Sequence, residues 1–276
     1  MDILLEKLFH IIGEKYGSDL AVYDISFVMD IVKKRMDSQG LHSFEEYVDN
    51  IEQSGREMES LLDSLNNTYT EFFRDPITLT LLSKRILPDI IYKKKQKSQM
   101  RIWVAGCSTG QEAYTIAMEV SDAIKKSGKE IRCAFFATDK SLDALEQAER
   151  AIYTYEQVQE IKLKYITEYF DPVNEGYKVK DSLRKCISFS YYDMLESATV
   201  NPPESVYGDF DIISCCNMLI YYSGCQRSKI INKILNSMSK QSVLVTSEAE
   251  RMIFENEDGL KSVPVSSCAF YKSRGN

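Results

Sequence analysis

Histidine and long apolar runs are scarce in this sequence of 276 residues. The two histidines, His10 and His42, stand far apart, and the seven cysteines show no CxxC spacing. Neither pattern is typical of a zinc site or another metal site, so no metal centre is expected. No apolar run is long enough to span a bilayer, and the first residues mix acids and lysines into their apolar positions. We therefore expect a cytoplasmic protein without an inserted membrane segment.

The positions of the cysteines agree with that expectation. Four of them lie in apolar runs that are typical of strands: Cys133, Cys186, Cys215 and Cys216. Buried thiols without partners suit a reducing compartment.

Two nucleotide-binding patterns are also absent. The turn VAGCSTGQE at 104–112 spaces its glycines as G-x-x-x-G, which is neither the dinucleotide pattern G-x-G-x-x-G nor a P-loop. Nicotinamide and nucleoside triphosphates are therefore disfavoured. Small residues at such a turn let a ligand approach the backbone, although a glycine-rich turn can also serve only as a connection.

Charge is unevenly distributed along the chain. The formal net charge is −7, and residues 1–64 hold six basic and fourteen acidic residues, whereas residues 84–101 hold seven basic residues and one acid. An acidic chain lacks the broad basic face that nucleic acid binding needs, so no nucleic acid partner is expected. The run KKKQK at 93–97 is either a solvated linker or a strip that faces an acidic partner.

Residues 1–65 have the pattern of a small helical domain. Apolar residues in ISFVMDIVKKRM recur at helical spacing, and Ser43 precedes Glu46 by three residues, as in a capping box. A linker segment is expected at 66–100 and a larger domain at 101–276. In that domain, strand-like and helix-like patterns alternate from RIWVA at 101–105 to SVLVTS at 242–247. The helix-like segments include LDALEQAERAIY at 142–153 and QRSKIINKILNSMS at 226–239, and the second is expected to carry Met238 on its apolar face.

This alternation predicts an α/β fold with a Rossmann-like, doubly wound, mostly parallel sheet. The segment YFDPVNEGYKVKDSL holds a proline and a glycine between short extended pieces. It predicts a small antiparallel β insertion at about 170–185.

Two acids follow predicted strands. Asp139 ends the strand IRCAFFATD and could accept hydrogen bonds from a ribose diol, while Asp193 follows the strand CISFSYY and could accept from an adenine amine. Either acid alone could instead cap the next helix. A glycine-rich turn followed by these two acids is the order found in methyltransferases that use S-adenosylmethionine.

Four ordered blocks sharpen this interpretation: TEFFRDP at 70–76, WVAGCSTGQEAYTIAM at 103–118, ATDKSLDALEQA at 137–148 and DIISCCNMLIYYS at 211–223. Taken alone, FFRDP is typical of a helix end packed on a core. Together the blocks resemble the CheR family of chemotaxis receptor methyltransferases, and the resemblance covers roughly residues 20 to 250.

The resemblance implies S-adenosylmethionine as the cofactor, with S-adenosylhomocysteine as its product. It assigns Thr70 and Arg74 to the cofactor's carboxylate region, Glu112 to its amino group and Asp139 to its ribose. Phe72 and Phe73 are expected to dock the segment that carries Arg74. The residues expected at the cofactor are Thr68, Thr70, Arg74, Gly106, Glu112, Asp139, Asp193, Met194, Cys216 and Asn217.

Three positions depart from the family pattern. Thr68 stands where the family usually has Asn, Ala113 where it has Pro, and Cys216 where it has Arg. The segment VTSEAE at 245–250 also replaces a Gly-His-Ser-Glu-like segment. Loss of the arginine removes a charged donor from the pocket edge.

The substrate implied by the resemblance is a glutamate side chain on the cytoplasmic helical region of a methyl-accepting chemoreceptor. Arg74 and Tyr221 are the expected catalytic residues, and the protein is expected to be a monomer. The basic residues 33–35 and 93–97 are expected to meet the receptor without help from a receptor tail. Two alternatives are a catalytically weak binding module and a methyltransferase for a small molecule.

Overall fold

The computed structural model of the chain describes residues 2–66, 69–196, 198–264 and 268–272. It divides into two compact units. The first comprises Met1–Asn67 with Ile220–Lys229, and the second comprises Thr68–Leu219 with Ile230–Asn276. The division into 1–65, 66–100 and 101–276 stays a prediction, and the segment 220–229 is the part that the structure groups differently.

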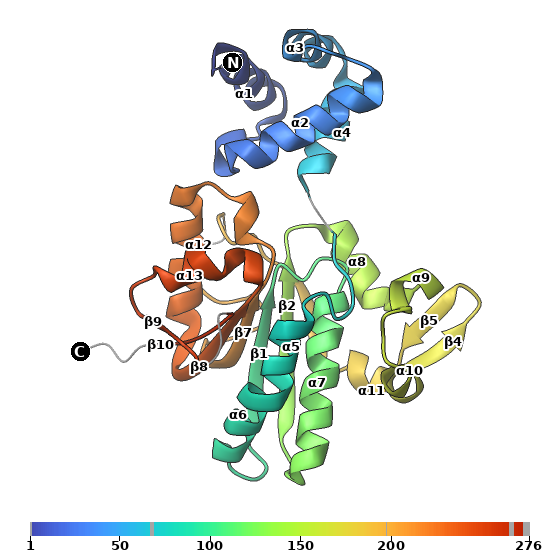
Figure 1. Cartoon of the computed structure of the whole chain (residues 1–276), viewed down its shortest axis with the longest axis vertical. Coiled ribbons are helices and arrows are strands. Elements are labelled where there is room, and N and C mark those ends of the chain that lie inside the picture. The colour runs from blue at the N-terminus through green and yellow to red at the C-terminus, as the bar shows by residue number, and fades with distance from the viewer. Residues whose placement is uncertain (1, 67–68, 197, 265–267, 273–276) are drawn as a thin grey trace. The chain divides into compact units, whose positions relative to one another are not determined.

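The first unit is built from helices (Figure 1): α1 (Asp2–Tyr16), η1 (Leu20–Val22), α2 (Ile25–Gln39), α3 (Phe44–Gln53) and α4 (Gly55–Leu65). Asp24 begins α2 by accepting the Ser26 N–H, and Ser43 begins α3 by accepting the Glu46 N–H at 3.1 Å. Gly40 ends α2 with φ 68°, a conformation that glycine adopts without strain. The core includes the fully buried residues Leu8, Ile12, Val28, Val32, Tyr47, Met58 and Leu61.

A partly buried ion pair joins two helices of this unit. Arg35 donates from Nε to Glu57 Oε1 at 2.9 Å and from Nη2 to Oε2 at 2.5 Å. Tyr47 donates to the same Glu57 carboxylate at 3.0 Å. Arg35 is therefore turned into the helical unit, whereas Lys33 and Lys34 are exposed.

The second unit is organised around a seven-stranded sheet of order β6-β2-β1-β7-β8-β10-β9. Neighbouring pairs from β6 to β8 are parallel, whereas β10 pairs antiparallel with both β8 and β9. The strands are β1 (Gln99–Ala105), β2 (Arg132–Asp139), β6 (Ile187–Tyr191), β7 (Phe210–Cys215), β8 (Met238–Thr246), β9 (Leu260–Ser262) and β10 (Ala269–Lys272). The expected Rossmann-like α/β fold is confirmed.

Helices pack on this sheet (Figure 1). α6 contacts α7, and α8 contacts β2 and β6. The helical elements after α4 are α5 (Pro76–Leu81), the π-helical η2 (Leu82–Ile86), α6 (Leu87–Lys93), α7 (Gln111–Ser127), α8 (Leu142–Arg150), α9 (Tyr155–Val158), α10 (Leu163–Tyr169), α11 (Asp181–Arg184), η3 (Leu219–Tyr221), α12 (Gly224–Ser237), η4 (Glu248–Glu250) and α13 (Arg251–Glu255). Parts of η3 and α12 belong to the segment 220–229 that groups with the first unit. Among the described residues, no helix combines the length and the apolar character needed to cross a membrane.

The expected antiparallel insertion is present as a small sheet of order β3-β5-β4. β4 (Phe170–Val173) and β5 (Gly176–Val179) form its hairpin. The third strand, β3 (Ile152–Tyr153), comes from residues whose pattern predicted the end of a helix. That helix stops at Arg150 because Ala151 takes the left-handed conformation with φ 56°.

Two further expectations need correction, and two strands were missed. Met238 begins β8 and does not lie on the apolar face of α12. The strands β9 and β10 were not anticipated, since neither carries a long apolar pattern. Of the four cysteines expected in buried strands, Cys215 is buried, Cys133 and Cys216 are half-buried, and Cys186 is exposed. Cys186 precedes β6, and Cys216 follows β7.

Candidate functional site

The candidate site residues from the sheet follow four neighbouring parallel strands. Gly106 follows β1, Asp139 ends β2, Asp193 follows β6, and Asn217 follows β7. Because the carboxyl ends of parallel strands lie at one edge of the sheet, the structure brings these residues to that edge.

The turn after β1 wraps over the end of β2. Gly106 has φ 72° and donates its N–H to the Thr138 carbonyl at 2.8 Å. A Cβ at this glycine would lie 3.0 Å from the sulfur of Met218, so the close approach favours glycine. The Ser108 N–H then donates to Oδ2 of Asp139 at 2.8 Å. Hydrogen bonds therefore join the glycine-rich turn after β1 to Asp139 at the end of β2.

Asp139 receives a second backbone bond, from the Ser141 N–H to Oδ1 at 2.9 Å. A carboxylate offers about four acceptor positions, so ligand hydroxyls can bond to it as well. Asp193 accepts from the N–H groups of Leu195 at 2.7 Å and Glu196 at 3.2 Å through Oδ1. Met194, beside it, is buried. Both acids thus stabilise the turns to which they belong.

Glu112 lies in the first turn of α7, and its Oε1 accepts the Ser214 hydroxyl at 2.6 Å. Burial, with a smaller contribution from the Glu250 carboxylate, raises the pKa of Glu112 to about 7. The Ser214 hydrogen bond, the Cys216 thiol and the positive charge of Arg74 act in the opposite direction. A cation placed beside Glu112 would favour its charged form.

Cys216 and Asn217 follow β7 directly. The Cys216 sulfur lies 3.4 Å from the Ser214 hydroxyl. Burial raises the pKa of the Cys216 thiol well above its usual value, so the thiol is neutral and unreactive near pH 7. Asn217 has φ 55°, the left-handed conformation that asparagine tolerates better than most residues.

The segment around Arg74 is anchored by its two phenylalanines, as expected. Phe72 is buried and packs edge-on against Tyr153, with ring centroids 4.8 Å apart. Phe73 stacks on Tyr165 with ring centroids 5.4 Å apart, and its N–H donates to the Thr115 hydroxyl. The block FFRDP precedes a helix and does not end one, because Asp75 caps α5 and Pro76 is its first residue.

Arg74 itself is exposed, and it donates to the Tyr69 carbonyl at 3.2 Å. Thr70 is half-buried. Thr68 lies outside the described residues.

Tyr221 is grouped with the first unit. Its ring centroid lies 4.7 Å from that of Phe27, and its carbonyl accepts the Asp24 N–H at 2.9 Å. The other described site residues belong to the second unit. The catalytic role of Tyr221 stays a prediction.

One residue at this edge of the sheet escaped the sequence analysis. Glu250 is fully buried, and its carboxylate accepts the N–H groups of Asn217, Met218 and Leu219. Its segment, VTSEAE, stood out only as a departure from a family pattern. The signal that could have found Glu250 is an acid beside the apolar run that forms β8.

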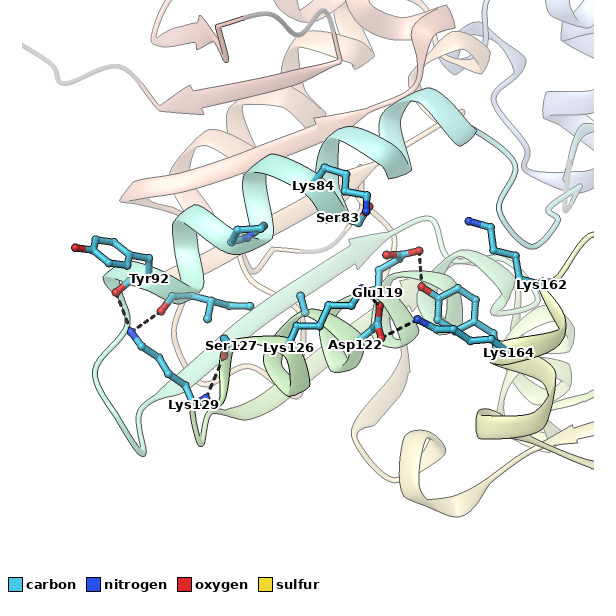
Figure 2. A pocket seen from close by; sticks show the side chains of 14 residues that line it. Ser83, Lys84, Tyr92, Glu119, Asp122, Lys126, Ser127, Lys129, Lys162 and Lys164 are labelled. Atoms are coloured by element: carbon cyan, nitrogen blue, oxygen red, sulfur yellow. Dashed lines mark hydrogen bonds and ion pairs between the residues drawn. The ribbon is translucent and has the colours of Figure 1, made fainter.

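A groove of about 610 Å³ lies elsewhere in the second unit, between residues 83–92, the second half of α7 and residues 162–165. Figure 2 shows Lys84 and Lys162 on opposite sides of it, with Glu119 and Asp122 on α7 between them. Lys126 and Lys164 both pair with Asp122. None of the candidate site residues lines this groove, so it is distinct from the site at the sheet edge.

Comparison with known proteins matches two family models to this chain. The model described as "CheR methyltransferase, SAM binding domain" matches residues 68–268, and "CheR methyltransferase, all-alpha domain" matches residues 3–65. The chain belongs to the CheR methyltransferase family. Its cofactor is S-adenosylmethionine, and it is an S-adenosylmethionine-dependent chemotaxis methyltransferase.

Curated relatives align with this CheR-family chain over most of their length. The chemotaxis protein methyltransferase of Borreliella burgdorferi is 27% identical over 89% of this chain and 87% of its own. Chemotaxis protein methyltransferase 1 of Pseudomonas aeruginosa is 29% identical over 89% of each chain. The Escherichia coli chemotaxis protein methyltransferase is 25% identical over 90% of this chain and 84% of its own.

The residues at the sheet edge fit the chemistry of this cofactor. Glu112 is a half-buried carboxyl beside a neutral hydroxyl and a neutral thiol, which suits the cationic amino group of a methionyl moiety. Asp139 at the end of β2 suits a ribose diol. These two assignments, and those of the other site residues, stay proposals.

Proposed function

We propose that this chain methylates glutamate side chains on the cytoplasmic helical region of methyl-accepting chemoreceptors. The observation that carries the proposal is the meeting of Gly106, Glu112, Asp139 and Asp193 at one sheet edge, in a chain that matches both CheR models. The names of the relatives support a chemotaxis role.

A glutamate carboxylate is a suitable acceptor for this site. Its pKa is near 4.3, so it is ionised at neutral pH and needs no general base. The sequence has no histidine after His42, so the second unit offers no imidazole for proton transfer. One carboxylate oxygen forms a bond to the methyl carbon while the bond from that carbon to sulfur breaks. The sulfur keeps the electron pair, and the products are a methyl ester and S-adenosylhomocysteine.

The work of the protein is then mainly positioning. When bound, S-adenosylmethionine supplies the electrophilic methyl group. The Arg74 guanidinium is exposed and presents a forked donor that suits carboxylates. We assign to Tyr221 the orientation of the attacked carboxylate through its phenol. The backbone around Arg74 is fixed by Phe72 and Phe73, which limits the freedom of its side chain.

Labelled methyl transfer tests the proposal. The chain is incubated with methyl-labelled S-adenosylmethionine and a receptor fragment from the organism that encodes it, and the label on the fragment is treated with base. We expect label that base releases as methanol, and a fragment with its candidate glutamates changed to alanine should take up little.

Base-stable label, or label found only on small molecules, would contradict the proposal. If the receptor fragment takes up no label and calorimetry detects no binding of S-adenosylhomocysteine, the results would favour a binding module.

A further inference from the structure

Glu250 joins two parts of the sheet edge. It lies in η4, directly after β8, and its side chain is fully buried. Its carboxylate accepts three consecutive backbone N–H groups: Asn217 at 2.6 Å, Met218 at 2.7 Å and Leu219 at 2.5 Å. Successive N–H groups that converge on one point form an anion-binding concavity. Here the anion is part of the chain itself.

Hydroxyl groups complete this arrangement. Thr246 and Ser247 donate to Oε2 of Glu250 at 3.2 Å and 3.0 Å. The carboxylate is thus bonded both to the end of β8 and to the turn after β7. Charge-assisted hydrogen bonds of this kind are stronger than neutral ones.

The turn that Glu250 holds has an unfavourable backbone conformation. Asn217 adopts φ 55°, a left-handed conformation that asparagine tolerates better than most residues but that still costs more than the right-handed one. The bond from the Asn217 N–H to Glu250 helps to hold this conformation. Without the carboxylate, three buried N–H groups would lose their acceptor, and the turn would be free to relax.

The end of β7 also connects Glu250 to Glu112. Ser214 on β7 donates to Glu112, and Cys216 lies between Ser214 and the turn at Asn217. The negative charge of Glu250 disfavours the ionised form of Glu112 and raises its pKa, in addition to the larger effect of burial. The titratable or charged groups that interact with Glu112 are Arg74, Cys107, Cys215, Cys216 and Glu250.

We propose that Glu250 is a positioning residue of the cofactor site: it holds the turn that presents Asn217 and keeps a fixed negative charge within electrostatic range of Glu112. The inference rests on the cofactor site proposed above. It makes cofactor binding sensitive to pH near neutrality, because Glu112 must be ionised to pair with an ammonium group.

Calorimetry of S-adenosylhomocysteine binding from pH 5.5 to 8.5 tests this role in the full chain. In the unaltered protein, affinity should rise with pH through about 7 and reach a plateau above it, as Glu112 becomes fully ionised. In Glu250→Gln, the plateau affinity should fall roughly tenfold or more, since bonds to a charged acceptor are lost. The midpoint of the rise should also move to lower pH, because the charge that disfavours ionised Glu112 is gone.

Glu248→Gln is the matched control, because Glu248 lies in the same short helix but is exposed. It should leave both plateau and midpoint unchanged. Glu112→Gln should remove the pH dependence altogether. If Glu250 were purely structural, Glu250→Gln would lower the plateau affinity without moving the midpoint, and that result would overturn the proposal. A plateau affinity of Glu250→Gln within twofold of that of the unaltered chain would overturn it as well.

Glu250→Asp serves if Glu250→Gln does not fold. It keeps the charge and shortens the reach, so affinity should fall while the midpoint stays near that of the unaltered chain. A moved midpoint in Glu250→Asp would contradict the proposal. The measurement involves no receptor, so failure of receptor methylation with these profiles intact would refute only the proposed substrate.

Discussion

The Ser214 hydroxyl donates a 2.6 Å hydrogen bond to Glu112 and so ties the end of β7 to the first turn of α7. This bond lowers the pKa of Glu112, whereas burial raises it more strongly, to about 7. Glu112 therefore changes charge in the range where the protein is expected to work. Its ionised form is disfavoured in the folded chain until a cation arrives.

Replacing Glu112 should separate stability from binding. Its pKa in the folded chain lies above the ordinary value of 4.5. The folded state therefore holds an extra proton between pH 4.5 and about 7, and the chain loses stability as pH rises through that range. Glu112→Gln cannot lose stability in this way. The melting temperature of the variant minus that of the unaltered chain should therefore be larger at pH 8 than at pH 5. Calorimetry should show weaker S-adenosylhomocysteine binding. The same melting difference at both pH values would refute the assignment.

Asp139→Ala should weaken cofactor binding by roughly 1 to 3 kcal/mol, the range for hydrogen bonds to a charged group. Asp139 also accepts the Ser108 and Ser141 N–H groups, so the variant should unfold at a lower temperature. Asp143→Ala is the control, since Asp143 is an exposed acid at the start of α8. Affinity that is unchanged in Asp139→Ala by calorimetry would remove Asp139 from the site.

Arg74→Ala should lower turnover far more than stability. The guanidinium is exposed, and its hydrogen bond to the Tyr69 carbonyl is a surface contact. Arg74→Lys should also be slow, because an ammonium cannot reproduce a forked pair with carboxylates. Turnover of labelled methyl groups and thermal melting measure the two effects. A variant that melts early but keeps its specific rate would show that Arg74 is structural.

Basic residues of the first unit should differ in their roles. Lys33 and Lys34 are exposed, whereas Arg35 pairs with the buried Glu57. The double variant Lys33→Ala, Lys34→Ala should methylate receptor fragments more slowly at 0.1 M salt and resemble the unaltered chain at 1 M, where the Debye length falls from about 10 Å to about 3 Å. Arg35→Ala should lower the free energy of unfolding by roughly 1 to 3 kcal/mol, since the buried Glu57 carboxylate loses its cationic partner and keeps the hydrogen bond from Tyr47.

Comparison of receptor fragments with and without their tails completes that test. A large loss of methylation on removing the tail, with little response to salt, would rule out recognition by Lys33 and Lys34.

The strip at 93–97 is less available for a partner than its sequence indicates, because Lys93 pairs with Asp89 and Lys94 pairs with Asp211.

Local patterns in the sequence determined much of the fold and the candidate site. The alternation of strands and helices, the glycine-rich turn after β1 and the acid that ends β2 all depend on neighbouring residues, so they could be recognised along the chain. The anchoring of Phe72 and Phe73 was also expected. The family followed from four such blocks in order.

Tertiary structure decided what depends on residues far apart in the chain. Ile152 and Tyr153 form a strand because β5 pairs with them, although their pattern continues a helix. Arg35 is turned inward because Glu57 and Tyr47 meet it from other helices. Glu250 is held by hydrogen bonds from three backbone N–H groups that lie about thirty residues earlier in the chain. Hydrogen bonds between distant backbone groups, and the charge of a buried carboxylate, depend on folded distances that no local pattern of residue types encodes.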